Sequence, residues 1–573
     1  MSALLAVTTG CSGSLSSQGP AEVDSATPNI LMVLLDDLGY SDIGAYGGSI
    51  STPTIDSLAG EGMQFTNYHA NPVCAPTRAT LMTGQDPHRV GLGSMDGLIA
   101  PGVASGSPGY KGSLEGTYIG IAELLSAADY NTYQVGKWHL GMGHGQTPQD
   151  LGFDQNFTMY QGGGSHYADA LRLVPGRQEP IDTLNYERNS EPVTELPADF
   201  YSTDAYTDEM LQLIRNGSSS DKPYFGYLAY TAPHDPLHEP DAALIQKYLD
   251  IFIDNNNLET LRAERIENMV DLGLIVADVA TRWPAQTPDW DTLTAPQKRD
   301  LAYRLAVYAA MVEHVDTQLG RIIDELKTTG EYDNTLIVVA SDNGAAGLSE
   351  DVYTQSPGAR EWLDEHYPLV DDLDSYGKPG SMPTLSLANA QVSSGPFFHT
   401  KSTVFEGGTR SPLIVKTPDR GQDGDRPRIV DTLVSVGDLY PTFADYAGAA
   451  IVDEHVLVGD SAKPLLDGTS DAIGDELLGL DMFGERAFRD GNSKLVFAAP
   501  GNGGTGTYAL YDLVVDPGET TDLAASNPQE VQRLAALWDQ YALENNVIPS
   551  SFVDVNASGD SSAPVYFKTD WAN

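Results

Sequence analysis

Cysteine is scarce in this sequence, with only Cys11 and Cys74 among 573 residues. A disulfide framework is therefore excluded, unless these two residues pair with each other. Basic residues are also few: 32 Lys and Arg face 80 Asp and Glu, which gives a net charge of −48. A field of this sign repels nucleic acid and anionic membrane surfaces, so we expect neither as a partner. Any site for an anion must concentrate its few cations locally.

Long apolar runs are absent too, since no stretch after the first residues is long enough to cross a bilayer. The N-terminus itself resembles a bacterial lipoprotein leader: an apolar run at residues 3–7 precedes Cys11, and a Ser- and Gly-rich tether follows at 12–19. The leader carries no Lys or Arg, so a misassigned start, or a plain tail over residues 1–27, is the alternative. A lipoprotein leader predicts export to the periplasm or outer membrane, with the lipid on Cys11 as the only membrane contact.

Strand-like and helical stretches alternate from Pro28 onward, which is typical of an α/β fold with a mostly parallel central sheet flanked by helices. Strands buried on both faces are rich in apolar residues, and such runs predict strands at residues 29–35, 130–136, 224–230 and 335–340. Helical periodicity predicts helices within residues 116–128, 241–282 and 294–328.

The C-terminal part of the sequence differs from the α/β region in composition and in the length of its predicted elements. Residues 345–400, rich in Gly, Ser, Pro and Asp, predict a long ordered loop over a site. From about residue 453, short strands (494–498 and 508–513) and a helix (528–544) predict a small α+β domain built on an antiparallel sheet. We therefore divide the chain into a leader and tether (1–27), a large α/β domain (28–450) and a small C-terminal domain (451–573).

Oxygen-bearing side chains follow two of the predicted strands. Asp36 and Asp37 end the first strand, and Asp342 and Asn343 end a later one. Ligands of open α/β sheets bind outside the carboxyl ends of the strands, so these residues should meet at one edge. Each pair alone could simply cap a turn. Three crowded carboxylates, however, favour a cation between them, and hard oxygen ligands suit Ca²⁺ or Mg²⁺.

Cationic and imidazole side chains follow other predicted strand ends. Cys74 precedes a predicted helix, whose N-terminal N–H groups favour an anion, and Arg78 lies one turn further. Each residue alone suits a structural role. Together with Cys74, these side chains predict one cationic pocket in an anionic protein: Arg78, Lys137, His139, His234 and Lys401.

The string Cys-Ala-Pro-Thr-Arg-Ala-Thr-Leu-Met-Thr-Gly at residues 74–84 resembles the Cys-x-Pro-x-Arg signature of type I sulfatases, which belong to the alkaline phosphatase superfamily. Residues 228–279 resemble the bacterial arylsulfatase branch, and residues 510–520 the closing sheet of the family. Other active-site segments of the family are matched in order, around Asp36, Lys137, His234, Asp342 and Lys401. The resemblance implies that the large domain is catalytic and hydrolyses sulfate esters.

The resemblance also implies roles for single residues. A maturing enzyme would oxidise Cys74 to formylglycine, whose hydrate attacks the sulfur of a small sulfated substrate. Ca²⁺, with Mg²⁺ as the alternative, would be held by residue 74 together with Asp36, Asp37, Asp342 and Asn343. Charge would be stabilised by Arg78 and Lys137. His139 would act as a base, and His234 with Lys401 would assist the leaving group.

Several readings stay open on the sequence alone. Hydrolysis of phosphonate or phosphate diesters is an alternative within the superfamily, and sulfated glycans are alternative substrates. A binding protein on an inactive scaffold is disfavoured, because the nucleophile, metal ligands and lysines are all present. His166 either lines the substrate side or packs structurally. Asp235 departs from the family pattern, and we expect its carboxylate to raise the basicity of His234.

Overall fold

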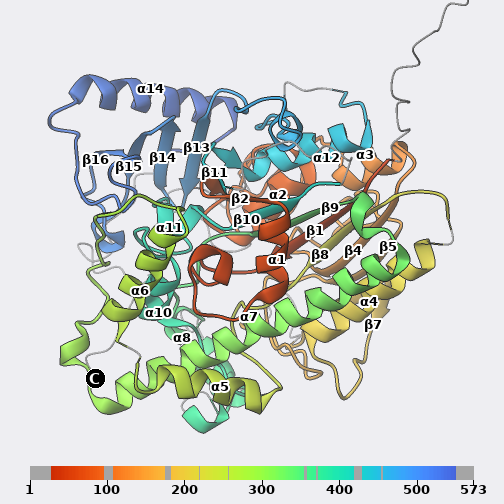
Figure 1. The fold of residues 1–573 in the computed structure, drawn as a ribbon, viewed down its shortest axis with the longest axis horizontal. Coiled ribbons are helices and arrows are strands. Elements are labelled where there is room, and N and C mark those ends of the chain that lie inside the picture. Colours follow the sequence, from red (N-terminus) through yellow and green to blue (C-terminus); the bar gives the residue numbers. More distant parts are fainter. Residues whose placement is uncertain are drawn as a thin grey trace, which may run out of the picture.

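The computed structural model describes residues 27–95, 103, 107–174, 182–218, 220–255, 257–353, 358–369, 372–418, 429–452 and 456–549 (Figure 1). Cys11 and almost all of the predicted leader lie outside these residues. No helix in the described part of the chain combines the length and apolar composition that a membrane span requires.

The described residues form a ten-stranded sheet whose centre is parallel (Figure 1). Strand β1 (Asn29–Leu35) pairs in parallel with β8 (Tyr224–Ala229) on one side and with β9 (Thr335–Ser341) on the other. Strand β4 (Asn131–Lys137) extends the parallel region between β8 and β5 (Gln155–Met159). Strands β1, β4, β8 and β9 lie within a few residues of those predicted, whereas β5 was not predicted. The mostly parallel sheet confirms the predicted fold class.

Shorter strands complete the sheet at both edges. One edge continues from β9 through antiparallel β10 to β2 and β11, and the other from β5 through antiparallel β6 to β7. A separate strand pair joins β3 to β12. The bounds of these strands are Met63–Phe65 (β2), Tyr68–His69 (β3), Tyr186–Arg188 (β6), Glu191–Val193 (β7), Leu413–Lys416 (β10), Ile429–Val430 (β11) and Val434–Ser435 (β12).

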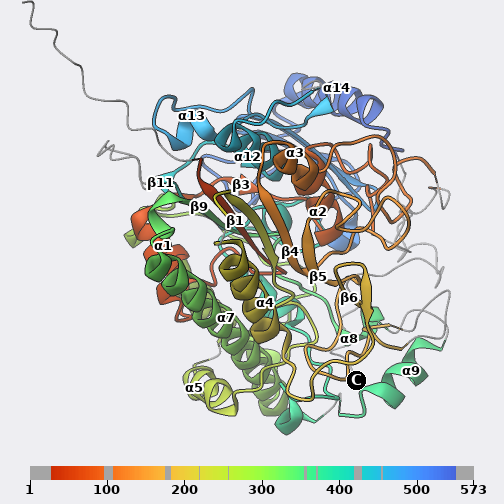
Figure 2. The ribbon, with the colours of Figure 1, turned by 90° about the vertical axis from the view of Figure 1, so that its right-hand side faces the viewer.

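Helices cover both faces of the sheet (Figure 2). One face carries α1 (Pro53–Glu61), α4 (Ser202–Gly217) and the long α7 (Ala295–Thr329), with α5 (Ala242–Phe252) packed on α7. The opposite face carries α2 (Cys74–Thr83), α3 (Ile121–Ala127), α12 (Leu439–Ala447) and α13 (Lys463–Leu466). This three-layer arrangement explains why the central strands are apolar on both faces.

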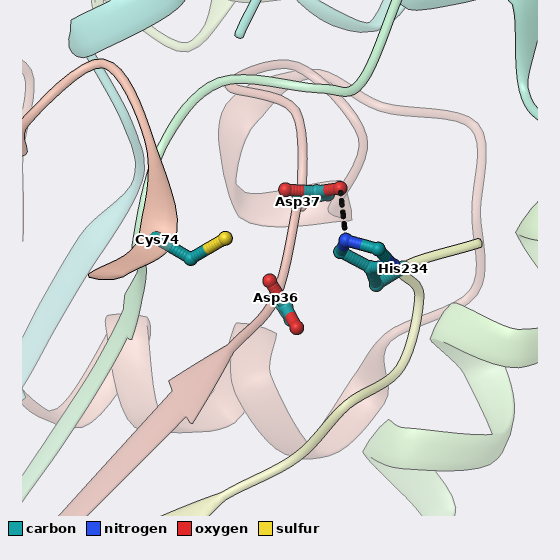
Figure 3. A group of neighbouring side chains, drawn as sticks. All are labelled: Asp36, Asp37, Cys74 and His234. Carbon is teal, nitrogen blue, oxygen red and sulfur yellow. Dashed lines mark ion pairs between the residues drawn. The ribbon is translucent and has the colours of Figure 1, made fainter. Parts of the chain in front are cut away.

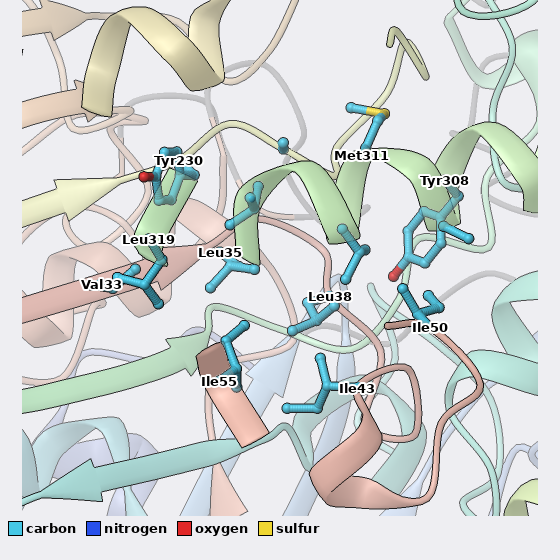
Figure 4. Close-up of a cluster of buried hydrophobic side chains, with 14 of the residues drawn as sticks. Val33, Leu35, Leu38, Ile43, Ile50, Ile55, Tyr230, Tyr308, Met311 and Leu319 are labelled. Atoms are coloured by element: carbon cyan, nitrogen blue, oxygen red, sulfur yellow. The ribbon is translucent and has the colours of Figure 1, made fainter. Parts of the chain in front are cut away.

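Strand β1 shows how the sequence builds the two cores. Its alternate residues Leu31, Val33 and Leu35 point to the core beneath α7, while Ile30, Met32 and Leu34 point to the core beneath α2 and α12. Figure 4 shows Val33 and Leu35 packed near Leu319 of α7 and Ile55 of α1. Burying every β1 side chain fixes the position of the residues that follow the strand.

The segment predicted as one long loop at 345–400 contains helices, so this prediction was wrong. It includes α8 (Glu350–Tyr353), α9 (Ala359–His366) and α10 (Ser386–Ser393). Every residue of α10 is buried, and the helix packs on α7 and on α6 (Leu258–Asp271). Tertiary packing therefore overrides the Ser- and Gly-rich composition of the segment.

The other predicted helices need smaller corrections. The helix expected at 116–128 is shorter, because Gly116 has a positive φ of 106° and α3 begins only after Gly120. Residues 241–282 contain two helices, α5 and α6, as the helical periodicity of the segment predicted. Single 3-10 turns lie at Gly44–Tyr46, Trp290–Thr292, Tyr332–Asn334, Leu373–Ser375, Val436–Asp438 and Pro500–Asn502.

The C-terminal part forms an antiparallel sheet of four strands within the described residues. The strands are β13 (Leu477–Met482), β14 (Glu485–Asp490), β15 (Ser493–Phe497) and β16 (Tyr508–Asp512). Helix α14 (Pro528–Glu544) covers one face of this sheet. The other face packs against Val73, Phe398 and Phe405, which come from the large α/β part of the chain. The small sheet thus supports the loops that carry residues 74 and 401.

Candidate active site

The predicted site residues meet at the carboxyl ends of adjacent strands. Asp36 and Asp37 follow β1, Asp342 and Asn343 follow β9, Lys137 ends β4 and His234 follows β8. The order β9-β1-β8-β4 in the sheet makes these four strand ends neighbours. The edge predicted from the sequence is therefore the place where these side chains gather.

Cys74 is the first residue of α2 and is almost fully buried. Val73 before it is extended, no side chain caps the helix, and the first turn has no acidic residue. The N–H groups of this turn and the helix dipole therefore favour an anion beside residue 74. Figure 3 shows Cys74 pointing towards Asp36 and Asp37. Burial raises the pKa of the Cys74 thiol, although Lys137 and Lys401 act in the opposite direction.

Two lysines pair with the carboxylates at the end of β1. Lys401 Nζ donates to Asp37 Oδ1 at 2.6 Å and to Cys74 Sγ at 3.5 Å. Lys137 Nζ donates to Asp36 Oδ2 at 2.5 Å. Burial alone would raise the pKa of Asp37, but Lys401, His234 and Lys137 lower it to about 2. Burial opposes the charge of Lys401 as well, yet Asp37 and its neighbours keep the lysine pKa well above its usual value.

Arg78 lies beneath the same cluster with no exposed surface. Its Nε and Nη2 donate to Asp342 Oδ2 at 3.1 and 2.8 Å. Its Nη1 donates to the Lys137 carbonyl at 3.0 Å and to the hydroxyl of Tyr227 at 3.4 Å. Burial and Asp36 raise the pKa of Asp342 to about 6, against the effect of Arg78. Arg78 therefore ties the helix of residue 74 to the ends of β9 and β4.

Three buried oxygen atoms at this edge accept no hydrogen bond from any described residue: Asp36 Oδ1, Asp37 Oδ2 and Asn343 Oδ1. The Asn343 amide is oriented by donation to Asp37 Oδ1 at 2.6 Å, which turns its oxygen away. Buried polar atoms without partners are rare, and a site for an ion is one standard explanation. Carboxylate and amide oxygen atoms of this kind are hard ligands that fit Ca²⁺ or Mg²⁺.

Four side-chain atoms that could bind a metal lie close together at this edge of the sheet. One ligand atom each from Asp36, Asp37, Cys74 and His234 lies within 4.8 Å of all the others. Asp342 is outside this group, and both of its oxygens already accept hydrogen bonds, Oδ1 from the Asp37 N–H at 3.2 Å. The structure thus brings Asp36, Asp37 and Cys74 together, with Asn343 hydrogen-bonded to Asp37, whereas the oxygens of Asp342 are shared with protein donors.

His234 has a defined orientation. Its Nδ1 lies 2.7 Å from the Asp235 carbonyl, which can only accept, so Nδ1 carries the hydrogen. Nε2 then points to Asp37 Oδ2 at 3.6 Å (Figure 3). Burial lowers the pKa of His234 to about 3, although Asp37 acts in the opposite direction.

The expectation for Asp235 was wrong. Its carboxylate accepts from the hydroxyl of Tyr353 at 3.2 Å, and its backbone carbonyl, not its side chain, contacts His234. Burial raises the pKa of Asp235 well above its usual value, with Asp37 and Glu350 adding to the effect. The neighbour in sequence therefore supplies a neutral acceptor rather than a charge to the histidine.

His139 is half-buried and has a positive φ of 59°. Its Nδ1 has no hydrogen-bond partner among the described residues. Burial holds the pKa of His139 well below its usual value, and the positive charges of Lys137 and Arg78 lower it further. A neutral imidazole beside cations is suited to accept a proton.

His166 lies behind His234 rather than in the cluster. Its ring is buried, and Nε2 lies 3.1 Å from the backbone carbonyl of His234. Of the two readings that the sequence left open, the structure supports packing. Sequence reasoning missed two neighbours, Gly162 and Gly163, which abut the rings of His139 and His234. The Gly-Gly-Gly run was the signal, since glycines often mark a close approach of the backbone.

Comparisons with known proteins agree with this geometry. The Sulfatase family model matches residues 28–449. The chain belongs to the sulfatase family. This confirms the resemblance found in the sequence and the predicted enzyme class, a sulfuric ester hydrolase.

Relatives of this sulfatase come from distant organisms. An uncharacterised sulfatase of Schizosaccharomyces pombe is 34% identical over 93% of this chain and 97% of its own. An arylsulfatase of Klebsiella aerogenes is 35% identical over 74% of this chain and 87% of its own. Among solved structures, Ps i-CgsB in complex with k-i-k-neocarrahexaose is 25% identical, with a TM-score of 0.63 over 93% of this chain and 96% of that one.

Proposed function

We propose that this sulfatase is an arylsulfatase, which hydrolyses sulfate esters to a phenol or alcohol plus sulfate through a formylglycine at position 74. The observation that carries the proposal is the position of Cys74. Residue 74 begins α2 beside Lys401 and faces buried carboxylate oxygens that accept no hydrogen bond from the described residues. The Klebsiella arylsulfatase supports the substrate class.

We further propose that Asp36, Asp37, Asp342, Asn343 and residue 74 hold Ca²⁺. The three unpartnered oxygens fit such an ion. When bound, Ca²⁺ would supply positive charge that polarises the sulfate oxygens. Asp342 would contribute while it also accepts from Arg78, and this hydrogen bond would hold its carboxylate in place.

The first step forms a bond from residue 74 to sulfur. One hydroxyl of the formylglycine hydrate gives its proton to Nε2 of His234, which lies near residue 74, and attacks the sulfur. The bond from sulfur to the ester oxygen breaks with its electron pair on that oxygen. Lys401 is charged in the resting protein, because Asp37 and Cys74 raise its pKa, and it can donate a proton to the departing oxygen. His234 can also do so, from Nε2, once that nitrogen has accepted the proton of the attacking hydroxyl, because Nδ1 is committed to the Asp235 carbonyl. Arg78 and Lys137 balance the charge on the sulfate.

The second step releases sulfate. His139 accepts the proton of the remaining hydroxyl, the carbonyl of formylglycine re-forms, and the bond between residue 74 and the sulfate oxygen breaks. Water then adds to the aldehyde and restores the hydrate. The low pKa of His139 keeps its imidazole neutral and ready to accept this proton.

Sulfated glycans are a second candidate substrate class. The Ps i-CgsB structure holds k-i-k-neocarrahexaose, and its fold covers 93% of this chain. We also propose, from the sequence alone, that a maturing enzyme converts Cys74 and that the chain is exported with a lipid on Cys11.

A substrate panel tests the function. Purified, matured protein is assayed with 4-nitrophenyl sulfate, a sulfated carrageenan oligosaccharide, and a phenyl phosphonate monoester at equal concentrations. We expect the aryl sulfate to give the highest kcat/KM. A higher value for the oligosaccharide would assign the enzyme to glycans, and a higher value for the phosphonate would contradict the proposal.

A further inference from the structure

His166 is held in one orientation and one tautomer. Its Nε2 lies 3.1 Å from the His234 carbonyl, and because a carbonyl only accepts, Nε2 carries the hydrogen. Its Nδ1 then accepts from the hydroxyl of Ser202 at 2.7 Å. Burial lowers the pKa of His166 to about 3, in keeping with a neutral ring. The residue is therefore a fixed donor to the backbone of the catalytic loop.

A second buried histidine fixes the backbone of His166. His238 Nε2 donates to the Ser381 carbonyl at 2.9 Å, which leaves its Nδ1 to accept from the His166 N–H at 3.4 Å. The two rings pack edge to face, with centroids 6.0 Å apart. His166 is thus bonded through both ring nitrogens and its backbone, and none of these bonds belongs to the proposed reaction.

The glycines just before His166 touch both catalytic histidines. A Cβ atom added to Gly162 would lie 2.6 Å from His139 Nε2, and one added to Gly163 would lie 2.8 Å from His234 Cε1. Both distances are too short for a carbon contact, so each ring rests directly on the backbone of the loop. One short segment therefore contacts the proposed base and the proposed proton donor at once.

We propose that residues 162–166 form a positioning segment, and that His166 is a positioning residue that directs His234 Nε2 towards the ester oxygen. This rests on the proposed function. The His234 ring is held through its Nδ1 by the Asp235 carbonyl and at its edge by Gly163, and His166 anchors the peptide that carries it. Without this donor the loop can turn, and a shift of about 1 Å in a reacting group is costly.

The test uses two variants of His166 and one matched control. His166→Gln keeps an amide N–H that can donate to the His234 carbonyl, whereas His166→Met fills similar space without a donor. Tyr201→Phe removes a buried hydrogen bond to the His238 carbonyl, 2.9 Å long, without touching His234. The melting temperature of each variant is measured alongside kcat and KM.

The readout is the dependence of kcat on the leaving group, over a series of aryl and alkyl sulfates. Proton donation matters most for poor leaving groups, so His166→Met should lose at least about tenfold more kcat on alkyl sulfates than on 4-nitrophenyl sulfate. His166→Gln should restore the wild-type slope, and Tyr201→Phe should keep it. An equal loss across the series in His166→Met, as in a variant that is only less stable, would overturn the proposal.

The two glycines provide an independent comparison. Gly163→Ala should push the His234 ring and give the same leaving-group dependence as His166→Met. Gly162→Ala should push His139 and slow every ester by a similar factor, because sulfate release is common to all of them. If log kcat depended on leaving-group pKa with the same slope in both alanine variants, Gly162 and Gly163 would not act on different histidines, which would contradict the proposal.

A spectroscopic readout separates this proposal from the proposed function. Nitrogen NMR of the histidine rings should show His234 with its hydrogen on Nδ1 in the wild type, and a mixture of tautomers in His166→Met. An unchanged His234 signal would overturn the positioning role even in an active enzyme. A wild type that hydrolyses no sulfate ester would instead overturn the proposed function, and the NMR comparison would still decide the role of His166.

Discussion

Lys401 Nζ lies 2.6 Å from Asp37 Oδ1 and 3.5 Å from Cys74 Sγ. One ammonium group thus joins a proposed metal ligand to the residue proposed as the nucleophile. Because Lys401 and Asp37 are both almost fully buried, their attraction is weakly screened by water. The lysine holds Asp37 ionised, and Oδ2 of Asp37, which accepts no hydrogen bond from the described residues, stays available to a cation.

The metal proposal predicts that Ca²⁺ stabilises the protein. At a concentration 100 times its dissociation constant, a bound ion adds about 2.7 kcal/mol to the free energy of unfolding. Asp37→Asn should abolish this gain, while Asp316→Asn, which changes a buried carboxylate bonded to the N–H groups of Thr54 and Ile55, should keep it. Thermal unfolding with chelator and with added Ca²⁺ measures the difference. An equal gain in Asp37→Asn would show that the ion binds elsewhere.

The two catalytic histidines should differ in their leaving-group dependence. His234→Ala should impair turnover of alkyl sulfates far more than of 4-nitrophenyl sulfate, because a proton donor matters most when the departing oxygen is basic. His139→Ala should slow breakdown of the sulfated enzyme, which is the same for every ester. Plots of log kcat against leaving-group pKa check both. If His234→Ala kept the wild-type slope and His139→Ala gave a steeper one, the two roles would have to be exchanged.

A buried ionic cluster joins the C-terminal sheet to α11 (Glu406–Thr409), close to Lys401. Lys494 Nζ lies 2.8 Å from Glu406 and 2.9 Å from Glu519, and all three side chains are buried. Lys494→Met should cost about 3–5 kcal/mol in unfolding free energy, because it removes the cation that two buried carboxylates share, although Glu406 keeps Arg410 at 3.4 Å and Arg489 at 4.0 Å. Lys247→Met breaks a more exposed pair with Glu313 and should cost at most about 1 kcal/mol. Denaturant unfolding compares them, and equal costs would contradict a buried-charge effect.

His88 predicts a pH dependence of stability. Its Nδ1 lies 2.8 Å from Asp86 and its Nε2 3.7 Å from Asp481 of β13. Burial opposes its charge, but Asp481 and Asp86 raise the pKa of His88 to about 9. A raised pKa means that the folded protein binds the proton more tightly, so the stabilisation is complete below about pH 6.5 and is lost as pH rises through about 9.

The matched variant is His88→Gln. Its unfolding free energy should fall below that of the wild type by up to about 3 kcal/mol at pH 6, and this gap should close by about pH 10. Denaturant unfolding at both pH values measures the gap. A gap that widens with rising pH would give the opposite sign and contradict the assignment.

The sequence predicted the parallel strands and the residues at their ends because both depend on local patterns. Strand β1 is apolar throughout, and Asp36 and Asp37 follow it directly, so the sheet edge could be inferred without coordinates. The partners of these residues could not be inferred. Asp235 was expected to act through its carboxylate, but the backbone of the loop turns its carbonyl to His234. Helix α10 was missed because its burial depends on contacts with α6 and α7, which are distant in sequence.

Peptide mass spectrometry of residue 74 in active protein tests the central claim most directly. The protein is produced with and without a maturing enzyme, digested, and the peptide that contains residue 74 is compared with specific activity on 4-nitrophenyl sulfate. We predict formylglycine at position 74 in proportion to activity, and no activity in Cys74→Ala. A fully active preparation that contains only unmodified Cys74 would contradict the account.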